Sequence, residues 1–236
     1  MSTDVENTMK TDLQHYILLA DLFRYPDAEF AGRVNRVQGI LDERYPAAGT
    51  ALRDFTDYAN KATLLELEEL YIRSFDVQAV TTLDIGYVLF GDDYKRGELL
   101  SNLNREHVAA HVDCGHELAD HLPNVLKLLA RLEDEELVNE LVKQIIAPAL
   151  NKMIDEFDSD RILKKNESYA KHYKTLIDTP VGTEAMTLYK HALNSLFEVV
   201  SDDFGIARQI PVVMTSDFLK NIATENEIEE KAQSFY

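Results

Sequence analysis

Cysteine is almost absent from this chain, whose 236 residues include a single one, Cys114. One thiol cannot form a disulfide within the chain, and such sequences are typical of reducing compartments. No run approaches the roughly 18–20 consecutive apolar residues that a membrane-spanning helix needs. The opening stretch, MSTDVENTMK, lacks the basic and apolar regions of a secretory signal peptide. These absences predict a cytoplasmic protein that does not insert directly into membranes.

Glycine and proline are also scarce, with 9 and 6 residues respectively. Such low counts favour helices joined by short loops over the many tight turns of an antiparallel sheet. Hydrophobic residues make up 45% of the chain, which is enough for a sizeable core. Apolar residues recur at the helical period, for example at Leu13, Tyr16, Ile17, Ala20 and Phe23. The sequence therefore predicts an all-α, single-domain bundle of about eight helices.

Local signals indicate where these helices begin and end. Thr63 followed by Glu66 matches a capping box, and Pro46 and Pro148 are expected to end or kink helices. The less regular stretch 76–92 is predicted to hold a short helix or an extended segment. Helices are predicted over residues 13–23, 27–44, 50–60, 63–75, 94–111, 120–133, 134–157, 161–178 and 183–200. The predicted organisation is a flexible N-terminus (1–10), a helical domain (11–200) and a weakly patterned tail (201–236).

Common catalytic and nucleotide-binding motifs are missing. The sequence has no G-x-x-x-x-G-K-[ST] loop, no G-x-G-x-x-G fingerprint and no G-x-S-x-G elbow. The acidic stretch from Asp155 does not fit a calcium loop, because Asp160 stands where glycine is needed and Asn166 where glutamate is needed. The sequence thus identifies no catalytic residue, and we expect neither enzymatic activity nor a resident metal or cofactor.

Positive charge is in short supply. The chain has 24 basic and 42 acidic residues, a net charge of −18. Nucleic acids and anionic membranes are poor partners for such a field, whereas a basic partner is attracted to it. The alternative interpretation is that the acidic surface only keeps the protein soluble or reflects a salty habitat.

The stretch GHELADHLP, which starts at Gly115, superficially resembles the zinc-binding HExxH motif. His116 and His121 are five residues apart, however, which places them about 140° apart around a helix rather than on one face. Pro123 fits the first turn of a helix better than its interior. We therefore predict that Asp120 is the N-cap of a helix whose buried stripe comprises Leu122, Val125, Leu126, Leu129 and Leu132.

A metal site remains an alternative for this region. His107 and His111 are four residues apart and could share a helix face, with Cys114 and His116 completing a zinc site. The other interpretation is that the histidines are polar residues at a helix end or along a groove, and that Cys114 is a small, half-buried hydrophobe.

Four stretches resemble the redox-enzyme maturation chaperones of the TorD/DmsD/NarJ superfamily, and most closely the NarJ-type chaperones of nitrate reductase assembly. They are RYPD from Arg24, LEELYIRSFD from Leu67, GDDYKRG from Gly91 and ELADHLPNVLKLLA from Glu117. Their order along the chain is that of the family, and the resemblance covers about residues 12–200. One departure is Ala119, which stands where the NarJ-type signature usually has proline.

The resemblance implies an all-helical cytoplasmic chaperone without catalysis. Such a protein binds the N-terminal peptide of a molybdoenzyme catalytic subunit, from nitrate reductase or a related enzyme. It assists insertion of the molybdenum cofactor before export or membrane docking. The match to the family's motifs implies a peptide-binding site made of Glu117, Asp120, His121 and Pro123, lined or braced by Tyr71, Phe75, Asp76 and Arg96.

Other interpretations stay open at this point. Tyr71 and Phe75 are equally consistent with plain core positions. A metal-dependent helical enzyme using the His107–His121 cluster and a non-catalytic helical adaptor subunit are the alternative functions. The expected partner is the catalytic subunit of a molybdenum oxidoreductase, with nucleic acid excluded and a homodimer as an option.

Overall fold

The computed structural model describes residues 13–158, 160–162 and 185–206. In these ranges the structure is helical, and the only β-type pairing is an isolated bridge between Asp84 and His121. The helices are α1 (His15–Ala20), α2 (Phe30–Arg44), α3 (Pro46–Ala59), α4 (Leu64–Phe75), α5 (Ile85–Phe90), α6 (Tyr94–Ala109), α7 (Leu122–Leu129), α8 (Glu135–Glu140), α9 (Ala147–Glu156) and α11 (Leu188–Phe204). The predicted all-α fold class is confirmed.

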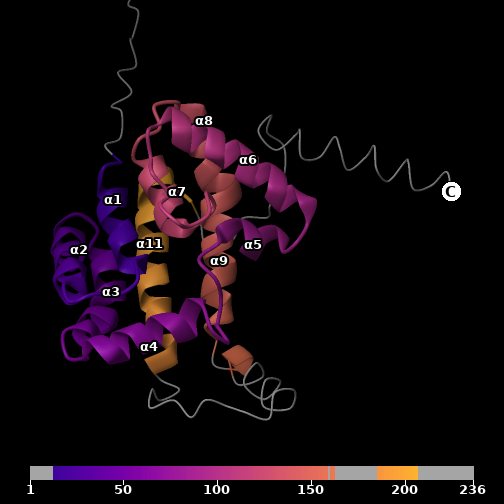
Figure 1. The fold of residues 1–236 in the computed structure, drawn as a ribbon. Helices are drawn as coiled ribbons and strands as arrows, with labels where there is room; N and C mark the ends of the chain where they lie inside the picture. Colours follow the sequence, from indigo (N-terminus) through magenta and orange to yellow (C-terminus); the bar gives the residue numbers. More distant parts are fainter. Residues whose placement is uncertain (1–12, 159, 163–184, 207–236) are drawn as a thin grey trace, which may run out of the picture.

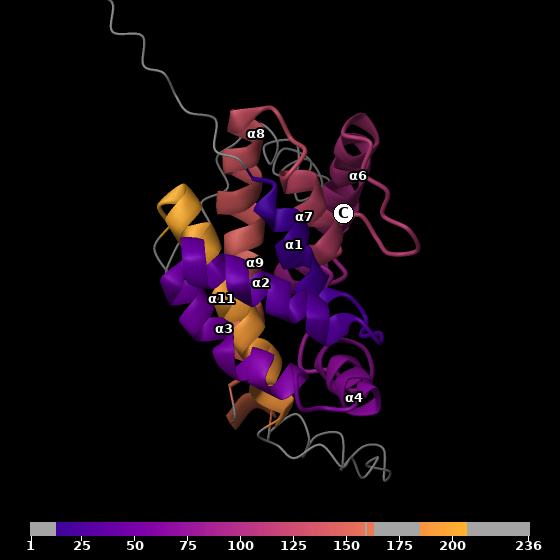
Figure 2. The same ribbon diagram turned by 90° about the vertical axis from the view of Figure 1, so that its left-hand side faces the viewer.

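The long helix α11 lies in the middle of the bundle, with α3 packed along one side and α9 along the other (Figure 1). Seen from the side, α2 and α3 together cover α11 (Figure 2). Helix α1 packs against α7, and α5 packs against α9. Helix α4 crosses the lower end of the molecule, where it contacts the short 3-10 turn Ala185–Thr187 that precedes α11. No described helix is long and apolar enough to cross a membrane.

Tyr189 of α11 occupies the centre of an aromatic cluster in the core. Its ring is fully buried and lies 4.9 Å from the ring of Phe55 and 4.6 Å from that of Phe75. Phe75 in turn packs 6.3 Å from Phe157 at the end of α9. Aromatic side chains bury large apolar areas and prefer such tilted and edge-to-face contacts. The cluster therefore joins α3, α4, α9 and α11 at one point.

The end of α11 is tied to the start of the bundle by a buried carboxylate. Asp203 accepts a hydrogen bond from the Tyr45 hydroxyl at 2.7 Å and lies 2.8 Å from Nε2 of His15. Burial acts to raise the pKa of Asp203, but the hydrogen bonds from His15, Tyr45 and Tyr16 hold it below its ordinary value. Helix α11 thus continues past residue 200 as part of the bundle and ends at Phe204.

Several predicted helix ends agree with the structure. Thr63 caps α4, since its hydroxyl accepts from the Glu66 amide while the Glu66 side chain accepts from the Thr63 amide, so the predicted capping box is confirmed. Pro46 does follow the end of α2, but it also opens α3, so this helix begins earlier than the predicted residue 50. The reason is that proline fits the first helical position, where its missing amide hydrogen is not needed.

The regular α-helical path predicted over residues 134–157 is interrupted just before Pro148. A π-helical segment, Leu141–Ile146, separates α8 from α9, and Pro148 is the second residue of α9. A proline ring clashes with the carbonyl four residues earlier in a regular helix, and a wider turn at that point relieves the clash. The predicted N-terminus 1–10, residues 163–178 of the helix predicted over 161–178, and the tail beyond residue 206 lie outside the described residues.

Candidate functional site

The loop that precedes α5 and the loop that precedes α7 are far apart in the sequence but run side by side in the structure. The amide of Ile85 donates to the carbonyl of Asp120 at 3.0 Å, and the amide of Leu122 donates to the carbonyl of Leu83 at 2.8 Å. Ile85 and Leu122 are the first residues of α5 and α7, and neither helix has a side-chain cap. The first amide of a helix has no hydrogen-bond acceptor within its own helix. Here each loop supplies that acceptor to the first amide of the helix that follows the other loop.

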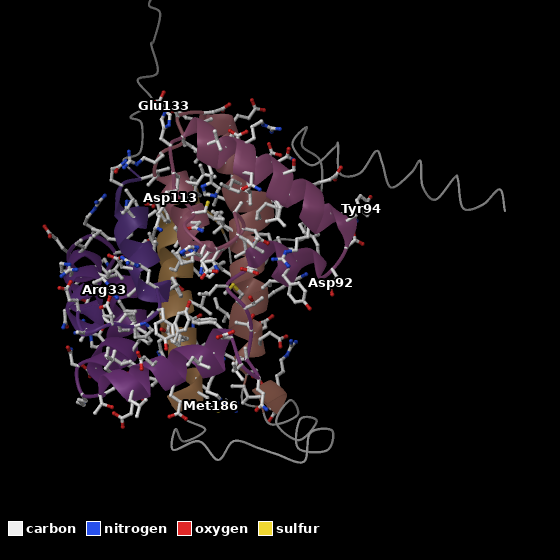
Figure 3. All side chains as sticks on the ribbon, viewed as in Figure 1. Arg33, Asp92, Tyr94, Asp113, Glu133 and Met186 are labelled. Carbon is white, nitrogen blue, oxygen red and sulfur yellow. The ribbon has the colours of Figure 1, made fainter. Side chains whose placement is uncertain are left out.

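Arg96 connects these loops to α6. Its Nε donates to Asp120 Oδ2 at 2.9 Å, and its Nη2 donates to Asp84 Oδ2 at 2.9 Å. The guanidinium also lies over the ring of Tyr87, 5.3 Å from the centroid. Figure 3 shows Asp92 and Tyr94 at the outer corner between α5 and α6, and Arg96 belongs to the first turn of α6. Asp84, Arg96, Asp120 and His121 are called the Arg96 cluster below.

The prediction that Asp120 is an N-cap is wrong. Helix α7 begins at Leu122, its N-cap position is His121, and no side chain caps it. The Asp120 side chain is instead fully buried against Arg96. An ionised carboxylate is stable in such a place only when a cation and hydrogen bonds compensate it, and Arg96 supplies both. The predicted placement of Pro123 in the first turn of the helix is confirmed.

Within the Arg96 cluster, His121 lies between Asp84 and the exposed carboxylate of Glu117. His121 Nδ1 lies 3.3 Å from Asp84 Oδ1 and 3.9 Å from Glu117 Oε2. The hydrogen bond from His121, helped by Arg96, holds the pKa of Asp84 below its ordinary value although the carboxylate is half-buried. These contacts therefore stabilise the folded chain above the unfolded-state pKa of Asp84, and the contribution is lost as pH falls through the lower folded-state pKa.

Gly86 marks how closely the Arg96 cluster is packed. A Cβ atom at this position would lie 2.6 Å from Asp120 Oδ2 and 3.0 Å from Leu99 Cδ2. Because Asp120 is held by Arg96, we expect Gly86→Ala to lower the free energy of unfolding by about 2–3 kcal/mol. Chemical denaturation measures this.

The matched control is Gly97→Ala, since Gly97 is a helical glycine of α6 with nothing within 4 Å of an added Cβ. This variant is expected to gain about 0.5–1 kcal/mol from the better helix propensity of alanine. Equal effects of the two substitutions would show that the space around Asp120 is not tight.

Tyr71 and Phe75 lie next to this cluster and continue into the core. The Tyr71 ring packs 5.4 Å from Phe75 and 5.2 Å from the exposed ring of Tyr25. Burial raises the pKa of Tyr71, and the nearby charge of Glu117 raises it further. Tyr71 therefore joins the acidic surface to the aromatic core, whereas Phe75, only 8% exposed, is mainly a core residue.

A groove of about 990 Å³ lies beside the Arg96 cluster. Asp76, which is exposed at the end of α4, lines it together with Asp84, Tyr87 and Arg96. The other residues of its wall are Phe75, Gln78, Ala79, Val80, Thr81, Thr82, Val88, Lys152, Asp155, Glu156 and Arg161. The eight residues predicted for the site thus fall in one region, around the two loops and the adjoining ends of α4, α6 and α7.

Asp84 and Tyr87 were missed by the sequence prediction. Both lie within the less regular stretch 76–92, in which neither periodicity nor a motif singles out any residue. Their role becomes visible only from the contacts with Arg96, which lies 12 positions beyond Asp84. Because the sequence does not decide between a helix and an extended segment here, it gives no indication that the Asp84 carboxylate belongs to the site.

The alternative zinc site is not assembled in the described part of the chain. His107 is buried and its Nε2 donates to the Ala119 carbonyl at 3.0 Å, and burial lowers its pKa. Helix α6 ends before His111, whose φ of 54° turns it away from the helical path. No group of three or more histidine, cysteine or acidic side chains among the described residues is arranged to hold a metal ion. The alternative in which His107 and His111 share one helix face is therefore not realised in this part of the chain.

Comparison with known proteins adds no family assignment, because no protein-family model matches the chain and no curated protein is similar to it.

Proposed function

We propose that the chain is a cytoplasmic, non-enzymatic chaperone of the TorD/DmsD/NarJ kind. In this proposal it binds the N-terminal peptide of a molybdoenzyme catalytic subunit, with nitrate reductase as the first candidate. It keeps that subunit in a state that accepts the molybdenum cofactor and delays export or membrane docking. The chaperone itself carries no metal or cofactor.

One observation supports this proposal above the others: the stretches that carry the family resemblance contact one another. Tyr25 of RYPD packs on Tyr71 of LEELYIRSFD. Arg96 of GDDYKRG binds Asp120 of ELADHLP. Stretches that resemble the family's motifs only by chance are not expected to contact one another, whereas the parts of one binding site must do so.

The surface around the contacts suits a basic, amphipathic peptide. Tyr25, Tyr87 and Leu118 expose 50%, 43% and 48% of their surface, which is unusual for large apolar side chains within one region. The exposed carboxylates of Glu117 and Asp76 stand among them. Apolar anchors beside acidic groups match the two faces of an amphipathic segment. The net charge of −18 attracts such a segment from a distance.

The test is calorimetry with a synthetic peptide that has the N-terminal sequence of the nitrate reductase catalytic subunit of the same cell. We expect Glu117→Ala and Leu118→Ala each to weaken binding by about fivefold or more, the level of a contact residue that matters. Both side chains are exposed, so melting temperatures should stay within about 2 °C of the unchanged chain. Raising salt from about 0.05 to 0.5 M should also weaken binding, since it screens the attraction.

Matched controls lie on other elements. Glu136 of α8 and Leu65 of α4 are exposed residues of the same types away from the two loops. Glu136→Ala and Leu65→Ala are expected to leave binding unchanged. Losses from these controls equal to those at Glu117 and Leu118 would refute the site, and a peptide that does not bind the unchanged chain at all would refute the proposed function.

A further inference from the structure

The Arg96 cluster carries more negative than positive charge. Asp84 and Asp120 are two carboxylates that share one guanidinium, and His121 adds a charge only when it is protonated. With a neutral histidine the cluster has a net charge of −1, and Glu117 at 3.9 Å from His121 adds another negative charge at its outer edge. Partly buried charge of one sign favours the arrival of a cation, because the protein interior screens it less than water does.

The three carboxylates differ in how well they can receive that cation. Asp120 is 0% exposed and its contact with Arg96 is internal, so no ligand reaches it. Glu117 is 62% exposed and well hydrated, where an ion pair contributes little. Asp84 lies between these extremes, since its side chain is 25% exposed and lines the groove.

Asp84 also has unused capacity for hydrogen bonds. Its Oδ2 accepts from Arg96 and its Oδ1 from His121. An ionised carboxylate offers about four acceptor positions, so these two donors leave about two for a ligand. Arg96 would stay in place during binding because its Nε is held by the buried Asp120.

We infer that Asp84 receives a cationic side chain of the bound peptide, with Arg96 and His121 fixing its carboxylate in position. The inference rests on the proposed function and assigns the charge recognition to one residue of the groove. Tyr87 lines the same groove and adds an aromatic ring to the pocket. Such rings cover the apolar stem of a lysine or arginine while its charged end reaches the carboxylate.

The test is a double-mutant cycle with the same N-terminal peptide. Each lysine of the peptide is replaced in turn by norleucine and each arginine by citrulline, and binding is measured to the unchanged chain and to Asp84→Asn. We expect one replacement to cost about tenfold in affinity with the unchanged chain and less than twofold with Asp84→Asn. Asp76→Asn and Asp155→Asn, which alter two exposed carboxylates of the same groove, serve as controls and should keep the tenfold loss.

Asp84→Glu keeps the charge and guards against a general effect of the substitution on folding. With Asp84→Glu, replacing the cationic residue of the peptide is expected still to cost most of the tenfold in affinity. Melting curves confirm that each variant is folded. The assignment to Asp84 is overturned if the loss persists in Asp84→Asn, or if it disappears in Asp76→Asn or Asp155→Asn. Absence of binding to the unchanged chain refutes the proposed function itself, so the two failures are distinguishable.

Discussion

Arg96→Met is expected to lower the free energy of unfolding by about 3–5 kcal/mol, the cost of leaving a buried charge without its partner. Asp120 is fully buried and takes its salt bridge from Arg96, so the variant must keep an uncompensated carboxylate or protonate it. For a chain of this size the melting temperature should fall by about 10 °C. Thermal unfolding followed by circular dichroism measures the change.

The buried charge of Asp120 is the expected cause of this loss. Without Arg96 its carboxylate loses the cation and the hydrogen bonds that compensate it, so the loss should depend on whether residue 120 carries a charge.

Two further variants control for the loss of an arginine as such. Arg36→Met removes an exposed arginine of α2 and should change the unfolding free energy by less than about 0.5 kcal/mol. Adding Asp120→Asn to Arg96→Met removes the buried charge and should recover more than half of the loss. If Arg96→Met and Arg36→Met have the same melting temperature, the Arg96–Asp120 pair does not stabilise the fold in the way its geometry indicates.

Tyr189→Ala is expected to have an effect of similar size for a different reason. The ring is 1% exposed and lies among the rings of Phe55, Phe75 and Tyr71. Deleting a buried aromatic side chain loses its transfer free energy and leaves a cavity, which together cost about 3–5 kcal/mol. Denaturant unfolding gives the value. Peptide binding should also weaken, because Tyr71 packs against Tyr189 on one side and supports Tyr25 on the other.

Tyr189→Phe separates packing from the hydroxyl, since it conserves the ring and should cost less than about 1.5 kcal/mol. Tyr94→Ala removes an exposed tyrosine of α6 and is expected to be close to neutral. A loss below about 1 kcal/mol for Tyr189→Ala would mean that the neighbouring rings close the space, and the aromatic cluster would then not determine the position of Tyr71.

The sequence was sufficient for features that depend on neighbours in the chain. The all-α class follows from helical periodicity, and the capping box at Thr63 follows from a pairing over three residues. Asp120 was misjudged because an aspartate shortly before a proline has the local pattern of an N-cap, while its actual partner, Arg96, is 24 positions away. The end of α6 before His111 is likewise followed by a loop that folds back on α6, where the Ala119 carbonyl accepts from His107, and helical periodicity carries no information on that contact.

The reciprocal capping of α5 and α7 has a consequence for how the site can be observed. First-turn amides of helices normally exchange with solvent quickly, because nothing in their own helix protects them. Here the amides of Ile85 and Leu122 are each bonded to the opposite loop, so both become exposed only when the loops separate. Their hydrogen-exchange rates therefore report the free energy of opening at this one place. If the exchange rates of these two amides change together, they measure the opening of the site in solution before any ligand is known.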